Sequence, residues 1–307
     1  MITNIFSRSN PMNFAIIAIL FLIPFILTVK NHYPLDFTLS ENIAFFSIYP
    51  LLMFSSFLID FMSKKNSLNK SDDYALLFFT LYICLIPDIF KNFPVVISNL
   101  FVLFAFRRLL SIQSLIAPKQ KIFDASFWIT IAAVFHFDAL WFLLLVFVSI
   151  IIHVSNDIKN WIIPLVGVFT AAVLILLYSF MFDSQLLENL LKDANSINFN
   201  LKNISEKLNN FSTVTFIILA MLLLIYQIST IGNYLTYILN SVRKVIIFLF
   251  LTLLVYIITD KEDGSILLYG AAPMAIASAN LMNSLSKKLI KESIIMLLLV
   301  LCVMAYL

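Results

Sequence analysis

Residues 124–153 read DASFWITIAAVFHFDALWFLLLVFVSIIIH, and this stretch decides how the apolar segments of the chain are arranged. Two apolar arms flank the polar triplet His136-Phe137-Asp138. Each arm has about 12–15 residues and would be roughly 18–22 Å long as an α-helix. The stretch is therefore either a short helical hairpin that turns at the triplet or one tilted helix of about 30 residues.

Basic residues decide between these two arrangements, because the cytoplasmic loops of membrane proteins are enriched in lysine and arginine. With a hairpin and a cytoplasmic N-terminus, 14 of the 20 basic residues fall on the cytoplasmic side: Arg8, Lys64, Lys65, Lys70, Arg107, Arg108, Lys119, Lys121, Lys159, Arg243, Lys244, Lys287, Lys288 and Lys291. With one tilted helix, the pairs Arg243-Lys244 and Lys287-Lys288 would face outward. The sequence thus predicts the hairpin and a cytoplasmic N-terminus.

Composition places the chain among membrane proteins. Of its 307 residues, 62% are hydrophobic and 12% are charged, whereas soluble domains have about 45–50% apolar and about 25% charged residues. The mean hydropathy is +1.00. We therefore expect an all-α fold, a polytopic transmembrane helix bundle in which residues 1–307 form a single transmembrane domain.

Apolar runs suited to crossing a bilayer occur about nine times outside the hairpin. They cover 14–30, 43–62, 74–91, 94–111, 161–182, 212–232, 244–260, 265–284 and 292–307. Small residues fill 270–279, which favours a central helix because small side chains let helix backbones approach closely. The polar stretch 183–211 has apolar residues at steps of three or four, which predicts an amphipathic loop on the outer surface, either a lid or a substrate gate.

The adjacent pair Arg107 and Arg108 is the first candidate site. Only four arginines occur among the 20 basic residues, so the pair is not the default basic choice of this chain. Arginine offers a planar fork that binds phosphate or carboxylate through two hydrogen bonds. Asn99 and Asp124 are the expected structural partners. The pair either fixes the hairpin through an ion pair with Asp124, binds a lipid phosphate or a pyrophosphate-linked carrier, or only marks topology.

His136, Asp138 and Asp36 are the candidate catalytic residues. Ionisable groups at membrane depth often carry function, and a histidine beside a carboxylate can act as a general base. Residues i and i+2 point to different faces of a helix, so His136 and Asp138 meet only if the hairpin tip is a turn. If the tip reaches the outer interface, both groups are solvated. Asp36 and Glu41 either flank a ligand in the first outer loop or belong to a solvated loop.

Metal, cofactor and nucleic-acid sites are not predicted. His32, His136 and His153 lack metal-ligand spacing, and Cys84 and Cys302 lie within apolar runs. The sequence contains no glycine-rich phosphate loop, no nucleophile elbow and no nucleic-acid-binding motif. Whether the chain is an enzyme stays open at this point.

Three stretches resemble a known family: FSRSNPMN at 6–13, LFAFRRL at 103–109 and KQKIFDASF at 119–127. It is an uncharacterised family of bacterial polytopic inner-membrane proteins, sometimes mislabelled as beta-carotene monooxygenases. The resemblance covers the whole chain and implies a multi-pass protein of the cell inner membrane, without an established function. Family members have an aromatic residue and a proline or small residue around 136–138, and His136 and Asp138 depart from that pattern.

More distantly, a short helix pair between full spans is similar to polysaccharide polymerases of the Wzy and EpsG type. Through them the chain looks like GT-C glycosyltransferases, which use lipid-linked sugars. Asp36 fits the acidic residue of their first outer loop, although no Asp-x-Asp is present. The likeness implies lipid-linked glycan or envelope polysaccharide assembly, with membrane lipids, a polyprenyl-phosphate-linked substrate and other envelope proteins as partners. The alternatives are a non-catalytic subunit or scaffold of an envelope complex, and a transporter.

Overall fold

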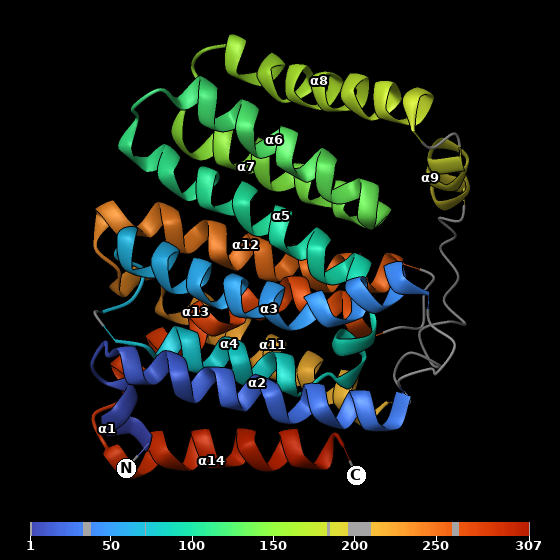
Figure 1. Cartoon of the computed structure of the whole chain (residues 1–307). Coiled ribbons are helices and arrows are strands. Elements are labelled where there is room, and N and C mark those ends of the chain that lie inside the picture. The colour runs from blue at the N-terminus through green and yellow to red at the C-terminus, as the bar shows by residue number, and fades with distance from the viewer. Residues whose placement is uncertain are drawn as a thin grey trace.

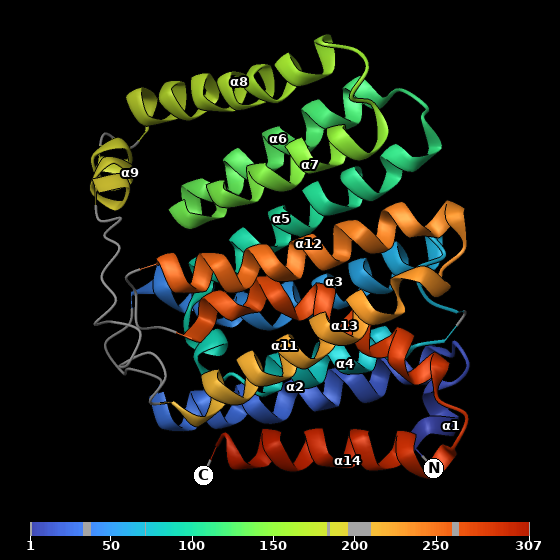
Figure 2. The ribbon, with the colours of Figure 1, turned by 180° about the vertical axis from the view of Figure 1, so that it is seen from behind.

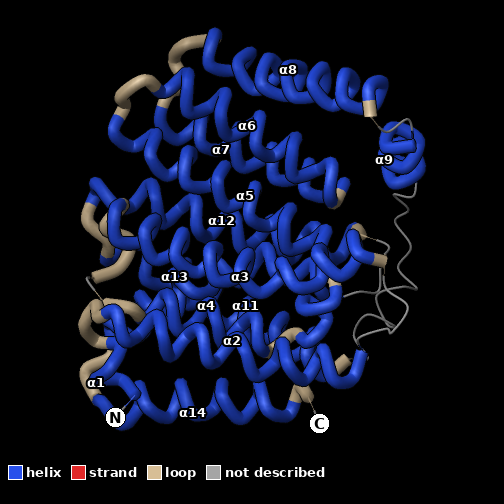
Figure 3. Tube along the Cα trace, viewed as in Figure 1, coloured by secondary structure: helices blue, strands red, loops and turns tan. Residues whose placement is uncertain are grey.

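The computed structural model describes residues 2–32, 38–70, 72–182, 185–195, 210–259 and 264–306, and these ranges form helices and loops without a strand (Figure 3). The helices, with η marking 3-10 helices, are α1 (Ile2–Phe6), α2 (Pro11–His32), α3 (Leu39–Lys65), α4 (Tyr74–Cys84), η1 (Pro87–Lys91), α5 (Phe93–Ser111), η2 (Ile112–Ser114), α6 (Pro118–Phe135), η3 (Phe137–Phe142), α7 (Leu143–His153), α8 (Lys159–Met181), α9 (Gln185–Asn195), α11 (Phe211–Thr230), η4 (Ile231–Asn233), α12 (Thr236–Ile258), η5 (Gly264–Leu267), α13 (Leu268–Ser284) and α14 (Lys288–Met304).

The long helices lie side by side and run alternately up and down one bundle (Figures 1 and 2). We call the end at which α2 begins the N-terminal end and the end at which α2 finishes the opposite end. α8 and α14 form the two edges of the bundle, and α9 lies across its opposite end. α13 lies at the centre, as the small residues at 270–279 predicted, and 94% of the most apolar stretch of η5 and α13 is buried.

Seven described helices are long and apolar enough to cross a membrane. They contain seven of the apolar runs expected from the sequence: α2, α3, α5, α8, α11, α12 and η5 with α13. The remaining two runs form shorter helices. α14 has 17 residues, and the run 74–91 does not form one continuous helix.

A proline explains why the run 74–91 is interrupted. α4 has 11 residues and ends at Cys84, and a 3-10 turn begins at Pro87. The proline ring disfavours helical backbone in the residue before it, and Ile86 is accordingly extended, with φ −118° and ψ 94°. Leu85 and Ile86 are buried, as is every residue of α4, so the broken backbone is enclosed by protein, a setting in which a membrane tolerates it.

The stretch 124–153 doubles back as a hairpin. His136 ends α6 in an extended conformation with φ −146° and ψ 108°, and η3 and α7 return toward the N-terminal end. The arms are longer than the sequence suggested, however: α6 has 18 residues because it begins at Pro118 instead of Asp124. The fixed φ of proline suits the first turn of a helix, so the polar residues after it extend the arm.

The hairpin packs against α8 at one glycine, Gly167. A Cβ added to Gly167 of α8 would lie 2.0 Å from Ser126 Oγ and 2.9 Å from the Phe123 carbonyl oxygen, both in α6. Ordinary carbon contacts begin at about 3.5 Å. Only the absence of a side chain at residue 167 therefore lets these two backbones approach so closely.

Candidate functional site

A pocket of about 510 Å³ opens at the N-terminal end of the bundle, between the ends of α3 and α5 and the beginnings of α6 and α12. We call it the basic pocket. Its lining consists of Phe61, Lys65, Asn66, Ser67, Arg107, Arg108, Leu110, Ser111, Gln113, Ser114, Lys121 and Tyr237. Four of these residues are cationic and none is acidic, so the pocket presents a concentrated positive potential.

Two of the cations rest on one aromatic ring. Arg107 Cζ lies 5.1 Å and Lys65 Nζ 5.2 Å from the centre of the Phe61 ring. Both distances are within the range of cation–π attraction. Phe61 precedes Lys65 by one turn of α3, so a single helix supplies the ring and one of its two cations. The ring thereby holds a lysine and an arginine from different helices close together.

The other two cations are held by hydrogen bonds. Arg108 Nε lies 3.1 Å from Asp124 Oδ2, which joins α5 to α6 across the pocket wall. Lys121 Nζ donates to the Ser111 carbonyl at 2.6 Å and to Ser114 Oγ at 2.7 Å. The Arg108–Asp124 distance is that of the ion pair weighed from the sequence as a fixing point of the hairpin. Arg107 has no carboxylate within ion-pair distance among the described residues.

The loops around the basic pocket contain unusual backbone. Among the described residues, three that are not glycine have positive φ: Ser67 (52°), Leu115 (56°) and Ala117 (45°). All three lie in the α3–α4 and α5–α6 loops, which border the pocket. Such left-handed residues cost of order 1 kcal/mol each and cluster at functional sites. The left-handed residues therefore lie in the loops that border the basic pocket.

Ser67 shows how α3 ends at this rim. The Ser67 N–H donates to the Lys64 carbonyl at 3.1 Å, and the Leu68 N–H donates to the Ser63 carbonyl at 2.9 Å. This pair of bonds is the Schellman motif, whose left-handed residue is usually glycine. A serine takes that place here and turns its side chain to the pocket.

Beneath the pocket, Lys244 of α12 is fully buried and donates from Nζ to the carbonyl of Leu109. That carbonyl belongs to the last turn of α5, whose free carbonyls attract cations. The bond connects α12 to the turn that follows Arg107 and Arg108. Gln113 supports the same region, because it donates to the Tyr237 carbonyl and accepts from Ser241 Oγ at 2.6 Å.

A second pocket of about 540 Å³ lies next to the first, and Ser67 and Tyr237 line both. We call it the amide pocket because four of its lining residues are asparagines. The lining consists of Ser67, Leu68, Asn69, Lys70, Tyr226, Thr230, Asn233, Tyr234, Leu235, Tyr237, Ile238, Asn280, Asn283 and Ser284. It has one cation and no acidic residue, so its polar groups are almost all uncharged amides and hydroxyls.

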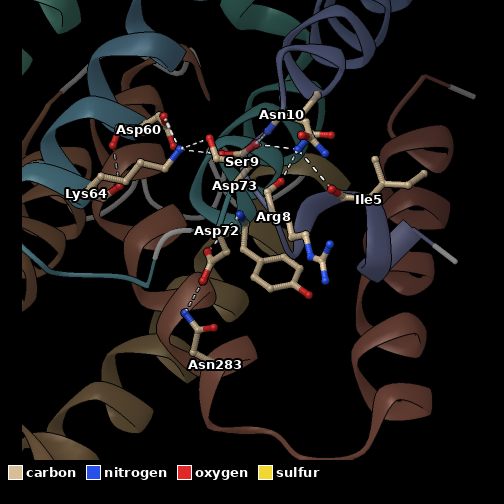
Figure 4. A network of polar contacts seen from close by, with 12 residues as sticks. Ile5, Arg8, Ser9, Asn10, Asp60, Lys64, Asp72, Asp73 and Asn283 are labelled. Atoms are coloured by element: carbon tan, nitrogen blue, oxygen red, sulfur yellow. Dashed lines mark hydrogen bonds and ion pairs between the residues drawn. The ribbon is translucent and has the colours of Figure 1, made fainter.

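A network of ionic contacts lies behind these pockets and binds the N-terminal helices to the bundle (Figure 4). Lys64 Nζ lies 2.7 Å from Asp60 Oδ2 and 2.6 Å from Asp73 Oδ1. The second oxygen of Asp73 accepts hydrogen bonds from Asn13 Nδ2 at 2.6 Å and from the Asn10 N–H at 3.2 Å. Asp73 is fully buried, and a buried carboxylate needs such partners. Lys64, Asp60 and Asp73 therefore have partners within the protein, which explains their burial without a ligand.

Asp72 extends this network toward the amide pocket. Its carboxylate accepts hydrogen bonds from Asn283 Nδ2 at 2.8 Å and from the Tyr74 N–H at 3.3 Å. Burial raises the pKa of Asp72 above its ordinary value, and these two hydrogen bonds act in the opposite direction. Because Asn283 lines the amide pocket, Asp72 fixes how one of the pocket amides is oriented.

The remaining candidates from the sequence lie elsewhere. His136 Nδ1 is 3.8 Å from Asp138 Oδ2, because the tip of the hairpin is a turn, and Asp138 Oδ2 also accepts from Thr259 Oγ1 at 3.0 Å. Asn99 is fully buried, and neither atom of its amide is hydrogen bonded to a described residue. Asn99 lies about 12 Å along α5 from Arg107, too far to be its direct partner. Asp36 lies outside the described residues.

These positions divide the sequence candidates between the two ends of the bundle. Lys121 and His136 lie near opposite ends of α6, which places them roughly 22 Å apart along the helix. The described residues around Asp36 are the end of α2 and the beginning of α3, both at the opposite end. Arg107 and Arg108 therefore do not share a reaction centre with His136 and Asp138.

Sequence reasoning found the arginine pair and missed most of the two pockets. Lys65 and Lys121 were read only as topology signals, and Phe61 and Tyr237 were not singled out. The amide pocket draws residues from four separate segments, and its asparagines show no regular spacing in the sequence. One pattern could have indicated the amide pocket: Asn280 and Asn283 are one helical turn apart at the end of an otherwise apolar run.

The chain belongs to the family of unknown function DUF6427, whose sequence profile matches residues 1–307. No curated protein and no solved structure matches the chain. The assignment covers the full length of the chain and brings no function with it. A function can therefore be inferred only from the residues of the two pockets.

Proposed function

We propose that this protein is a polytopic membrane protein that holds the phosphate-bearing head group of a polyprenyl-type lipid in its basic pocket, as a step in the assembly of a lipid-linked glycan in a bacterial inner membrane. The observation that supports the proposal is the convergence of four cations, without an acidic lining residue, on a pocket at the ends of apolar helices. Basic pockets between transmembrane helices bind lipid head groups in this way.

The basic pocket suits a group that carries more than one negative charge, as a phosphate or pyrophosphate does. Arg107 has no ion-pair partner among the described residues and rests on Phe61, so its fork is free to receive two phosphate oxygens. Lys65 lies beside it as a point charge. A pocket of about 510 Å³ is the size of a site for a drug-like ligand, so it has room for more than one phosphate.

The position at the helix ends suits a lipid. A head group in the basic pocket leaves its hydrocarbon chain free to lie along the apolar outer surfaces of the bundle. α3 presents such a surface next to the pocket, where Phe54 and Phe57 are exposed. The ligand then needs no route through the protein, which favours a lipid carrier over a solute that is transported.

We assign binding to the basic pocket, and no reaction. His136 and Asp138 are at the other end of α6 and do not reach a phosphate beside Arg107. The likeness to GT-C glycosyltransferases matched Asp36 to the acidic residue of their first outer loop. Asp36 lies outside the described residues, so this likeness supports the lipid class and no catalytic pair.

Purification in mild detergent, followed by mass spectrometry of the extracted lipids, tests the proposal. The wild-type protein should retain a polyprenyl phosphate or pyrophosphate, and the double variant K65Q/R107Q should lose most of it. K159Q is the matched control, because Lys159 is an exposed cation at the same end that does not line the pocket. A protein that brings stoichiometric protein partners and no such lipid would instead support the scaffold.

A further inference from the structure

The amide pocket shares a wall with the basic pocket, and the two pockets differ in charge. Ser67 and Tyr237 line both pockets, so the two cavities lie side by side at these two residues. The first pocket is strongly cationic, and the second is polar with one cation. A ligand that fits both therefore has an anionic part joined directly to an uncharged polar part.

The polar groups of the amide pocket match hydroxyl groups. A hydroxyl donates one hydrogen bond and accepts others, and an asparagine amide likewise offers donors and an acceptor. Asn69, Asn233 and Asn280 supply such amides from three different segments. Tyr226 and Tyr234 add aromatic surface with a polar tip, which suits a ligand that has both apolar and polar faces.

Asn69 shows that the pocket is incomplete by itself. Neither the amide nitrogen nor the amide oxygen of Asn69 is accessible to solvent or hydrogen bonded to a described residue. A buried amide without partners is costly, by more than a typical hydrogen bond contributes. Asn69 lines the pocket, so once its side chain turns toward the cavity, a ligand with hydroxyl groups would supply the missing bonds.

Several other groups in the pocket are already fixed in position. Tyr226 OH donates to Ser284 Oγ at 2.9 Å, and Asn283 Nδ2 is held by Asp72 at 2.8 Å. Groups held in this way lose little freedom when a ligand binds, which favours selective recognition. The left-handed Ser67, at the boundary of the two pockets, adds a hydroxyl where a glycine would relieve strain.

We propose that the amide pocket binds the sugar of a sugar-phosphate lipid whose phosphate occupies the basic pocket. This inference rests on the proposed function and deepens it, because it names the head group as a sugar joined through phosphate to the lipid. The two pockets then form one site with two parts. Cations of the basic pocket bind the phosphate, and amides and hydroxyls of the amide pocket form hydrogen bonds with the sugar.

Binding of short-chain probes to the full-length protein in lipid nanodiscs tests the inference. The probes are farnesyl pyrophosphate and farnesyl pyrophosphate that bears glucose, galactose, mannose or N-acetylglucosamine. At least one sugar-bearing probe should bind more tightly than farnesyl pyrophosphate. The variant N69A/N280A should reduce that preference roughly tenfold, since each lost hydrogen bond costs about two- to tenfold in affinity. Its affinity for farnesyl pyrophosphate should not change.

Controls separate this inference from the function on which it rests. N156A removes an exposed asparagine at the same end that lines neither pocket, and it should leave all affinities unchanged. Unchanged binding of farnesyl pyrophosphate to N69A/N280A also shows that the variant is folded. The inference is overturned if no sugar-bearing probe is preferred, or if N69A/N280A weakens all probes equally, while K65Q/R107Q still weakens them. If K65Q/R107Q binds every probe as the wild type does, the basic pocket itself is not the site.

Discussion

Ser67 is the residue at which backbone strain and ligand chemistry meet. Its φ of 52° ends α3 in a conformation that glycine adopts without cost, yet its side chain lines both pockets. Ala117 has a similar φ of 45° in the next loop and lines neither pocket. The two residues therefore form a natural pair for separating strain from recognition.

We expect S67G and A117G both to stabilise the protein by about 0.5–1 kcal/mol, because glycine removes the left-handed penalty and loses part of this gain through greater freedom when unfolded. Only S67G should weaken binding of the preferred sugar-bearing farnesyl probe, by about two- to fivefold for one lost hydrogen bond. Thermal unfolding and probe titration measure the two effects. Equal affinities of S67G and A117G would show that the Ser67 hydroxyl contacts no ligand.

At this scale the sequence revealed which residue types were unusual, but not what they faced. The pair Arg107-Arg108 stood out because arginine is rare in this chain. Phe61, Lys65 and Lys121 did not, because a cation near the end of a span is ordinary in a membrane protein. Their meeting depends on the packing of α3, α5 and α6, and no local pattern encodes that packing.

At the scale of elements, Pro87 follows the break after α4, and Gly167 lets α8 approach α6 closely. The sequence placed the hairpin turn correctly from the charges that follow it, but made its arms too short. Hydropathy grouped 74–91 into one run although it contains Pro87 and Asp88, because hydropathy does not register backbone conformation. Gly167 was not singled out, since only the observed contact with α6 gives it meaning.

G167A should destabilise the protein by about 1–3 kcal/mol, the usual cost of forcing an extra carbon into a packed contact. The added Cβ would lie 2.0 Å from Ser126 Oγ, so α8 must move away from the hairpin. G232A is the matched control, because a Cβ there meets nothing within 4 Å. Thermal unfolding in detergent compares the two.

The second variant, S126A/G167A, should recover only part of the lost stability, because the Phe123 carbonyl would still lie 2.9 Å from the new Cβ. Melting temperatures of G167A and G232A that agree would mean that α8 does not depend on this contact.

At the scale of the whole molecule, the fourteen basic residues that the sequence assigned to one side belong to segments at the N-terminal end of the bundle. They include the cations of both pockets. The hairpin is what makes this segregation possible, because it returns the chain to that end before α8 begins.

Cysteine labelling in intact cells tests which end faces the cytoplasm. E188C lies on α9 at the opposite end, and N156C lies in the loop before α8 at the N-terminal end. A membrane-impermeant maleimide should label E188C, and it should label N156C only after the membrane is opened. The native Cys84 and Cys302 are buried, so the wild type serves as the unlabelled control. Labelling of N156C in intact cells would reverse the orientation.

The buried α4 also has a consequence for how the protein is made. Its 11 residues are too few to cross a bilayer alone, and they are enclosed partly by α13, which begins at Leu268. At about 5–20 residues per second, a ribosome needs roughly 10–40 s to travel from the end of α4 to that partner. During this interval α4 can pack against α2 and α3, but it still lacks α13 and α14. The packing of α4 is therefore complete only when the last eighth of the chain has been inserted.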